Sequence, residues 1–276
     1  MNKLNFATAG IPYGTPKPNT VNGVKYLPEV GLDAMEIQFT HGINLTPKSA
    51  ELVKQTAKES NVLLTCHAPY YINLNSTDPK KIEASKQRIL KSAKIANMAG
   101  AWSVCFHPAY YGKSEKQNTY NIVKLHLKEI VEELKAEKNK IWIRPETMGK
   151  NSQFGDIDEI IKLSQELSQV LPCIDFSHIF AKSLGKQNTK PQFTSILEKV
   201  EKQLGKTALK NMHIHMSGIA YGQKGERNHL MLKDSEFNYR GVLSALKDFN
   251  TKGILTCESP ITTKDALLLK ETYTNL

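Results

Sequence analysis

Two patterns of hydrophobic and polar positions alternate along the chain. Short apolar runs rich in β-forming residues recur at 4–9, 34–39, 62–67, 102–107, 141–146, 172–176, 211–216 and 253–258. Apolar residues at helical spacing fill 47–59, 79–99, 119–137, 156–169, 190–204, 238–249 and 262–273, whereas 20–30 is the least helical connection. Because strands that alternate with helices form parallel sheets, the pattern predicts an α/β protein.

The number of strands and the length of the chain narrow the fold. Eight strand–helix units in 276 residues, with no linker between them, favour a single closed (β/α)8 TIM barrel over an open doubly wound sheet. No glycine-rich phosphate loop follows the first strand, which weighs against a nucleotide-binding sheet. We therefore predict one barrel domain over residues 1–276, with its active site at the C-terminal ends of the strands.

Composition adds few constraints. Hydrophobic residues make up 40% and charged residues 23%, as in ordinary globular proteins. No apolar run approaches the roughly 20 residues that span a bilayer, and the apolar part of the N-terminus is too short for a signal peptide. Four scattered cysteines form no CxxC pair, so we expect buried free thiols, and a cytoplasmic monomer without membrane contact.

The net charge of +10 suggests a polyanionic partner such as nucleic acid. Lysine supplies nearly all of this charge, since only four residues are arginine. A lysine-rich surface can equally serve solubility, so the charge alone leaves both interpretations open.

Residues that can bind metals stand at the ends of six successive predicted strands. They are His67, His107, Glu146, Asp175 with His178 beyond it, His215 and Glu258. Any one of them alone would more often be a hydrogen-bonded core histidine or a helix N-cap. In a barrel all six strand ends meet at one face, and such a crowd of carboxylates and imidazoles is costly without cations. This mixture suits Zn²⁺, Mn²⁺ or Fe²⁺ better than Mg²⁺ or Ca²⁺, and its size suits two or three ions.

Other polar residues near these strands have more ordinary interpretations. His213 lies two residues before His215 on the same strand, and we interpret it as a core residue or as a support for a ligand, rather than as a ligand itself. His41 and His126 fall in a loop and a helix with no site around them. Arg144 shares a strand face with Glu146, and we expect it to support that carboxylate.

Six short segments resemble the successive motifs of one known family. They are "HAPYYINL" (67–74), "FHPAYY" (106–111), "PETMGKNSQFG" (145–155), "CIDFSH" (173–178), "HIHMSG" (213–218) and "CESP" (257–260). In this order they resemble endonuclease IV, the zinc-dependent apurinic/apyrimidinic endonucleases within the xylose isomerase-like barrels. The resemblance covers nearly the whole chain.

The resemblance implies a set of ligands and an activity. The first metal would be held by His67, His107 and Glu146, and Glu146 would bridge to a second. The second would also use Asp175, His215 and Glu258, and a third would use His178 and His229. A metal-bridging hydroxide would hydrolyse the phosphodiester 5′ of an abasic site in double-stranded DNA and leave a 3′-hydroxyl. Glu146 and Glu258 are the candidate catalytic residues.

Two segments depart from the family pattern. The third site usually takes Asp-x-His, but in "KGERNHLML" the residue two positions before His229 is Arg227. Glu226, one residue further back, could substitute with its longer side chain. We then expect a weakly held third ion and Arg227 turned away from it. The loop at 40–46 looks shorter than the family's DNA-contacting loop.

Loops at the same face carry candidate DNA contacts. Lys113, Lys150, Lys182 and Arg227, with Lys186 and Lys224, are predicted to contact phosphates. Tyr70 and Tyr71 either wedge into a base stack or pack at the barrel mouth. Two other functions stay open: a metal-dependent sugar isomerase or epimerase on the same barrel, and a non-catalytic DNA-binding relative.

Overall fold

A computed structural model, which describes all residues 1–276, contains one central sheet of eight parallel strands. The strands are β1 (Leu4–Ala9), β2 (Ala34–Gln38), β3 (Leu63–His67), β4 (Ser103–Phe106), β6 (Trp142–Pro145), β8 (Cys173–Asp175), β9 (Met212–Met216) and β12 (Gly253–Cys257). Their order is β6-β4-β3-β2-β1-β12-β9-β8. Isolated pairs Ile143–Val170 and Glu146–Cys173 join the two edges into a nearly closed barrel. The predicted (β/α)8 fold is confirmed.

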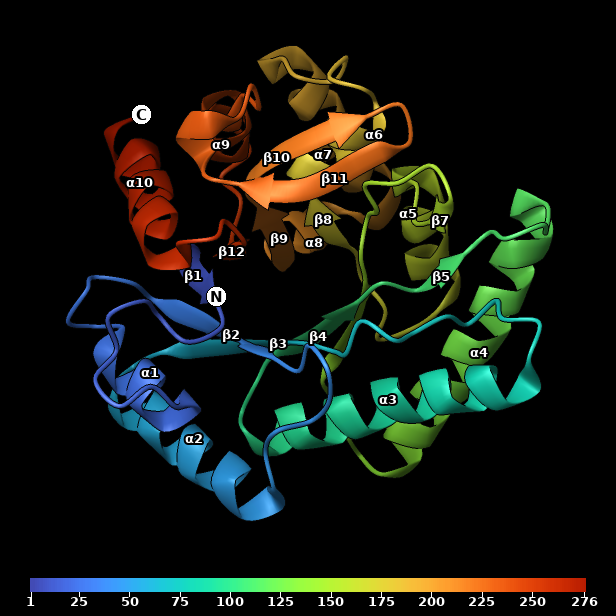
Figure 1. The fold of residues 1–276 in the computed structure, drawn as a ribbon, viewed down its shortest axis with the longest axis horizontal. Helices are drawn as coiled ribbons and strands as arrows, with labels where there is room; N and C mark the ends of the chain where they lie inside the picture. Colours follow the sequence, from blue (N-terminus) through green and yellow to red (C-terminus); the bar gives the residue numbers. More distant parts are fainter.

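Helices surround the sheet (Figure 1). They are α1 (Thr20–Tyr26), α2 (Pro47–Glu59), α3 (Pro79–Met98), α4 (Lys116–Ala136), α5 (Ile157–Glu166), α7 (Lys190–Leu204), α9 (Tyr239–Asp248) and α10 (Thr262–Asn275). Helix α3 shows why these segments are helical. Asp78 accepts the Lys80 backbone N–H, Pro79 occupies the first turn, and Ile89 and Leu90 lie in the buried stripe.

Several short elements were not predicted. They are α6 (Phe176–Lys182), α8 (Lys206–Leu209), the 3₁₀ turn Leu232–Asp234, the pair β5 (Ala109–Tyr110) and β7 (Gln153–Phe154), and the hairpin β10 (Gly218–Gly222) and β11 (Gly225–Leu230). The hairpin lies beside α6 (Figure 1). Most of these elements follow the C-terminal ends of barrel strands, where they build the mouth, and they are too short to show a hydrophobic period.

The barrel and its helices share one apolar core of 66 buried residues. All four cysteines are buried and free, as expected. None of the helices is long and apolar enough to span a bilayer.

The prediction for Arg144 was wrong. Its guanidinium is buried but donates to the carbonyls of Pro172 (2.9 Å) and Asn211 (2.7 Å), which precede β8 and β9. It also lies over the rings of Trp102 and Trp142, at 4.6 and 5.6 Å. Although it shares a strand face with Glu146, its long side chain reaches the opposite end of the barrel, where it ties strand starts together.

Candidate metal centre

The first predicted ligand group meets at the ends of three neighbouring strands. His67 ends β3, His107 follows β4 and Glu146 follows β6. The Oε2 atom of Glu146 lies 3.4 Å from His67 Nε2 and 3.5 Å from His107 Nε2. His67 and Glu146 are buried, while His107 is a quarter exposed to the mouth. The three donors therefore face a common point that is open to solvent on one side.

The other oxygen of Glu146 faces a second group. Its Oε1 atom lies 3.3 Å from His215 Nδ1, and the same nitrogen is 3.5 Å from Glu258 Oε1. The donor atoms of Glu146, Asp175, His215 and Glu258 all lie within 4.8 Å of one another. Each oxygen of the Glu146 carboxylate thus faces a different group, which is the arrangement of a bridging ligand.

Asp175 lies at the junction of β8 and α6, and its two carboxylate oxygens have different surroundings. Its Oδ1 atom accepts the backbone N–H of His178 at 2.8 Å and so caps α6. Its Oδ2 atom is buried without a hydrogen-bond partner. The helix that Asp175 caps carries His178 toward a third group of donors.

The third group combines α6 with the β10–β11 hairpin. Glu226 Oε2 lies 3.6 Å from His178 Nε2, and Glu226 Oε1 lies 3.9 Å from His229 Nε2. In β11 the pairing shifts by one residue, so that Asn228 opposes Ala220 but Glu226 opposes Tyr221. This bulge leaves Arg227 as the extra residue and brings Glu226 and His229 to one face although they are three residues apart. Arg227 is exposed.

A glycine makes room for the third group. A Cβ atom at Gly149 would stand 2.8 Å from Glu226 Oε2 and 3.0 Å from His178 Cδ2. The Gly149 carbonyl also accepts the Glu226 backbone N–H at 2.9 Å, which holds β11 against this segment. The Glu226 side chain therefore depends on a glycine 77 positions earlier in the chain.

In four of the five candidate ligand imidazoles, the second nitrogen has a hydrogen-bond acceptor. The Nδ1 atoms of three histidines face backbone carbonyls: His67 with Ala68 (2.6 Å), His178 with Thr147 (2.9 Å) and His229 with Glu258 (3.0 Å). Donation of Nδ1–H to these oxygens assigns the tautomer and leaves Nε2 free toward the carboxylates. This second hydrogen bond is typical of metal-binding histidines.

For His215 the acceptor is a residue that sequence reasoning missed. Glu36, from the middle of β2, lies 3.2 Å from His215 Nε2 and 2.8 Å from His213 Nε2. His213 also contacts Ser103 Oγ at 3.0 Å, so it lies deeper in the barrel and both its nitrogens have partners. An acid at an inward position of a strand, in "AMEIQF", was the available signal for Glu36.

The buried charges of this centre are coupled. Burial opposes ionisation of Glu36, but His215 and His213 outweigh it and hold the pKa of Glu36 well below its usual range. Burial lowers the pKa of His67, but the Glu146 carboxylate outweighs it and raises that pKa to about 9. Without a cation, protons must balance these carboxylates.

The donor set fits divalent cations. Glu146 Oε2 and Asp175 Oδ2 are buried with no hydrogen-bond donor, and unsatisfied carboxylate oxygens in an interior are costly. Neutral imidazoles and carboxylates together suit Zn²⁺, Mn²⁺ or Fe²⁺. The residues present can therefore hold two ions through Glu146 and a third through His178, Glu226 and His229.

The predicted DNA contacts are distributed around the mouth. Tyr70 packs against His67 and His107, with ring centroids 5.3 and 5.6 Å apart, and remains 44% exposed. Tyr71 is 59% exposed, Lys113 and Arg227 are exposed, and Lys150 is half-buried beside Gly225.

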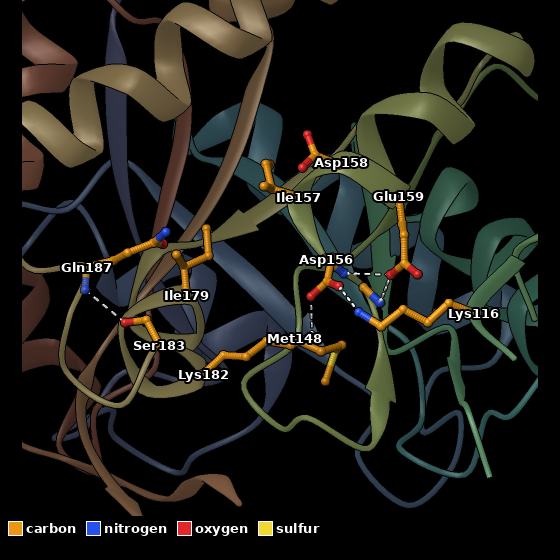
Figure 2. A pocket seen from close by; sticks show the side chains of 11 residues that line it. Lys116, Met148, Asp156, Ile157, Asp158, Glu159, Ile179, Lys182, Ser183 and Gln187 are labelled. Atoms are coloured by element: carbon orange, nitrogen blue, oxygen red, sulfur yellow. Dashed lines mark hydrogen bonds and ion pairs between the residues drawn. The ribbon is translucent and has the colours of Figure 1, made fainter. Parts of the chain in front are cut away.

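Lys182 differs from the loop position expected for it. It is the last residue of α6, and its ammonium pairs with Asp156 Oδ1 at 2.5 Å (Figure 2). Asp156 also pairs with Lys116 at 2.7 Å, in a cavity of about 370 Å³ beside α5 and α6. The charge of Lys182 is therefore largely balanced within the protein, and a DNA contact would compete with this ion pair.

Comparisons with known proteins agree on the fold. The profile of the family described as xylose isomerase-like TIM barrel matches residues 24–273. The uncharacterized protein MJ0133 of Methanocaldococcus jannaschii is 47% identical over 273 residues, which cover 99% of this chain and 98% of that protein. A probable endonuclease 4 of Aquifex aeolicus is 26% identical over 216 residues, covering 76% of this chain and 74% of its own.

Two solved structures that are named as different enzymes resemble this chain to a similar degree. A D-tagatose 3-epimerase-like protein has a TM-score of 0.72 at 20% identity, with 98% of this chain and 96% of its own covered. Endonuclease IV from Thermus thermophilus has a TM-score of 0.71 at 18% identity, with 99% of both chains covered. At such identities the likeness concerns the fold alone.

Proposed function

The chain belongs to the xylose isomerase-like TIM barrel family, and from this premise we propose that it is a metal-dependent DNA-repair endonuclease. It hydrolyses the phosphodiester 5′ of an abasic site in double-stranded DNA and leaves a 3′-hydroxyl. Two or three divalent ions, zinc in the first place, are its cofactors. Relatives named endonuclease 4 support the nuclease activity, and a relative named apurinic-apyrimidinic endonuclease supports the abasic substrate.

One observation carries the proposal, namely the third donor group beside the bridging carboxylate. A single ion would be served by Glu146, Asp175, His215 and Glu258. The chain adds His67 and His107 on one side of Glu146 and His178, Glu226 and His229 on the other. Several ions around one point suit a phosphodiester, whose attacking and leaving oxygens both need charge stabilisation.

The residues around this point have separate roles. When bound, divalent ions supply a nucleophile at neutral pH and neutralise the phosphate. Glu146 and Glu258 hold negative charge at the centre, and the Nδ1–H bonds of His67 and His178 keep these rings oriented. Tyr70, which lines the mouth and touches two ligand imidazoles, would exclude water from one side.

The alternative is a sugar epimerase or isomerase with one ion, which the similar fold of the epimerase-like protein favours. Such a reaction needs a base beside the substrate carbon. Each carboxylate of the centre faces an imidazole within 4 Å, and these are Glu36, Glu146, Asp175, Glu226 and Glu258. Because no carboxylate of this set is left over as a free base, we favour the hydrolase.

The test is cleavage of a labelled duplex that carries one abasic site, with zinc and with chelator. We expect a nick only with metal, and a new end that a DNA polymerase extends. Glu146→Gln and Asp175→Asn should lower the cleavage rate at least about 100-fold, because each removes a negatively charged carboxylate that would bind the ions.

The same duplex without the abasic site is the control and should stay intact. Wild-type rates in either variant would contradict the assigned ligands. Turnover of a ketose by wild-type protein, with no nicking, would favour the epimerase.

A further inference from the structure

A second cavity, about 500 Å³ in volume, lies beside the candidate metal centre. Its walls include Tyr70 and Tyr71 after β3, Tyr110 in β5, and Lys80, Lys81 and Arg88 of α3. We call these six residues the tyrosine groove. Tyr70 separates the groove from His67 and His107, so the two sites share a wall.

The groove combines exposed aromatic faces with unpaired positive charge. Tyr70, Tyr71 and Tyr110 are 44%, 59% and 42% exposed. Lys80, Lys81 and Arg88 have no acidic partner within 4 Å, and the structure contains no salt bridge that involves them. By contrast, Lys86 and Lys94 of the same helix are paired with glutamates of α4. The charge in the groove is therefore free for an anion.

The backbone that carries the tyrosines is held in place. Asn73 Oδ1 accepts the N–H groups of Asn75 and Tyr110, at 3.1 and 3.2 Å. Asn75 Nδ2 donates to the carbonyls of Tyr110 and Tyr111, at 2.9 and 3.2 Å. The Tyr71 hydroxyl lies 3.2 Å from His41 Nδ1. A groove fixed in this way loses little conformational entropy when a ligand binds.

We propose that the tyrosine groove binds an unpaired nucleotide of the strand that is cut, so that the enzyme prefers sites flanked by single-stranded DNA. Base faces stack on tyrosines, and the phosphate meets Lys80, Lys81 and Arg88. A paired base hides both faces in the duplex stack, whereas an unpaired base offers them. The volume fits one nucleotide within the usual range of ligand sites. The inference rests on the proposed function for its substrate.

The test measures binding apart from cleavage. Chelator-treated protein is titrated by fluorescence anisotropy with three probes that carry the same stable abasic analogue. One is fully paired, one has the adjacent nucleotides of the same strand mismatched, and one is single-stranded. Wild-type protein should bind the mismatched probe more tightly than the paired one. Tyr71→Ala with Tyr110→Ala should remove that preference, with a loss of about tenfold on the mismatched probe.

Charge is tested with a matched pair of triple variants. Lys80→Gln, Lys81→Gln and Arg88→Gln together should flatten the log–log salt slope for the single-stranded probe by about 0.7, the contribution of one neutralised phosphate. Lys58→Gln, Lys140→Gln and Lys210→Gln remove the same charge at exposed positions near strand starts and should leave the preference intact. Tyr71→Phe, which keeps the ring, should bind like wild type.

Three results overturn the inference. They are equal binding of paired and mismatched probes by wild type, wild-type preference in the tyrosine variant, and equal losses of affinity in both triple variants. The cleavage assay tests the proposed endonuclease activity separately. If the abasic duplex stays intact but binding still depends on the groove, the proposed reaction is wrong and the groove proposal stands.

Discussion

Glu36 offers the sharpest test of the centre, because it is fully buried and contacts a ligand imidazole from behind. Four donors converge on its Oε2 atom, from Thr65 (3.1 Å), Cys105 (3.3 Å), His213 (2.8 Å) and His215 (3.2 Å). Its Oε1 atom accepts only the Gln38 amide, at 2.9 Å. In Glu36→Gln the amide oxygen can keep the four donors while the new NH₂ group faces Gln38, whose half-buried amide can turn over. We therefore expect a folded protein.

The expected loss is in metal affinity. The substitution turns a charge-assisted hydrogen bond from His215 into a neutral one, which costs about 1 to 1.5 kcal/mol. It also removes a negative charge behind a ligand imidazole. Changes of this kind lower metal affinity roughly 10–100-fold, or about 1.4–2.7 kcal/mol. We expect this loss in the binding step that involves His215.

Competition between the protein and a chromophoric zinc chelator resolves the steps. Thr65→Val is the matched control, since it removes a neutral donor from the same oxygen and keeps the charge. It should change affinity no more than about threefold, given the modest net value of a neutral hydrogen bond. Wild-type affinity in folded Glu36→Gln, or equal losses in both variants, would refute the role of the Glu36 charge.

Three further predictions concern the third ion, pH and the barrel base. Gly149→Ala should release one ion first under mild chelation and leave two bound, measured by metal analysis, because its Cβ would crowd Glu226; simultaneous loss of all ions would contradict this. The pKa of His67 near 9 exceeds its unfolded value of about 6.5, so its stabilisation of metal-free protein is complete below pH 6.5 and is lost toward pH 9. The rise in Tm caused by zinc should therefore grow over this range, and a constant rise would reject the coupling. Arg144→Met should cost about 2–4 kcal/mol in urea unfolding, because two carbonyls lose their donor, with metal content unchanged; lost metal instead would revive its link to Glu146.

Local pattern was sufficient for the barrel and for most of the candidate ligands. The apolar periods predicted the eight strands to within one or two residues, because a side chain's exposure repeats every two residues in strands and every 3.6 in helices. Parallel strands in a barrel share one C-terminal face, so residues such as His67 and Glu258 could be expected to meet although 191 positions separate them. The resemblance to endonuclease IV then suggested which of them share an ion.

Tertiary structure alone decided the finer contacts, because these depend on register and reach rather than on period. The sequence suggested that Glu226 could replace the expected acid and that Arg227 would turn away, but the extra residue in β11 that makes this possible appears only in the strand pairing. The length of the Arg144 side chain carried its charge to the far end of the barrel. Glu36 contacts His213 and His215 across the barrel interior, although they are 177 and 179 positions away in the chain. A sequence shows which face a residue occupies, but only the closed barrel shows what stands opposite.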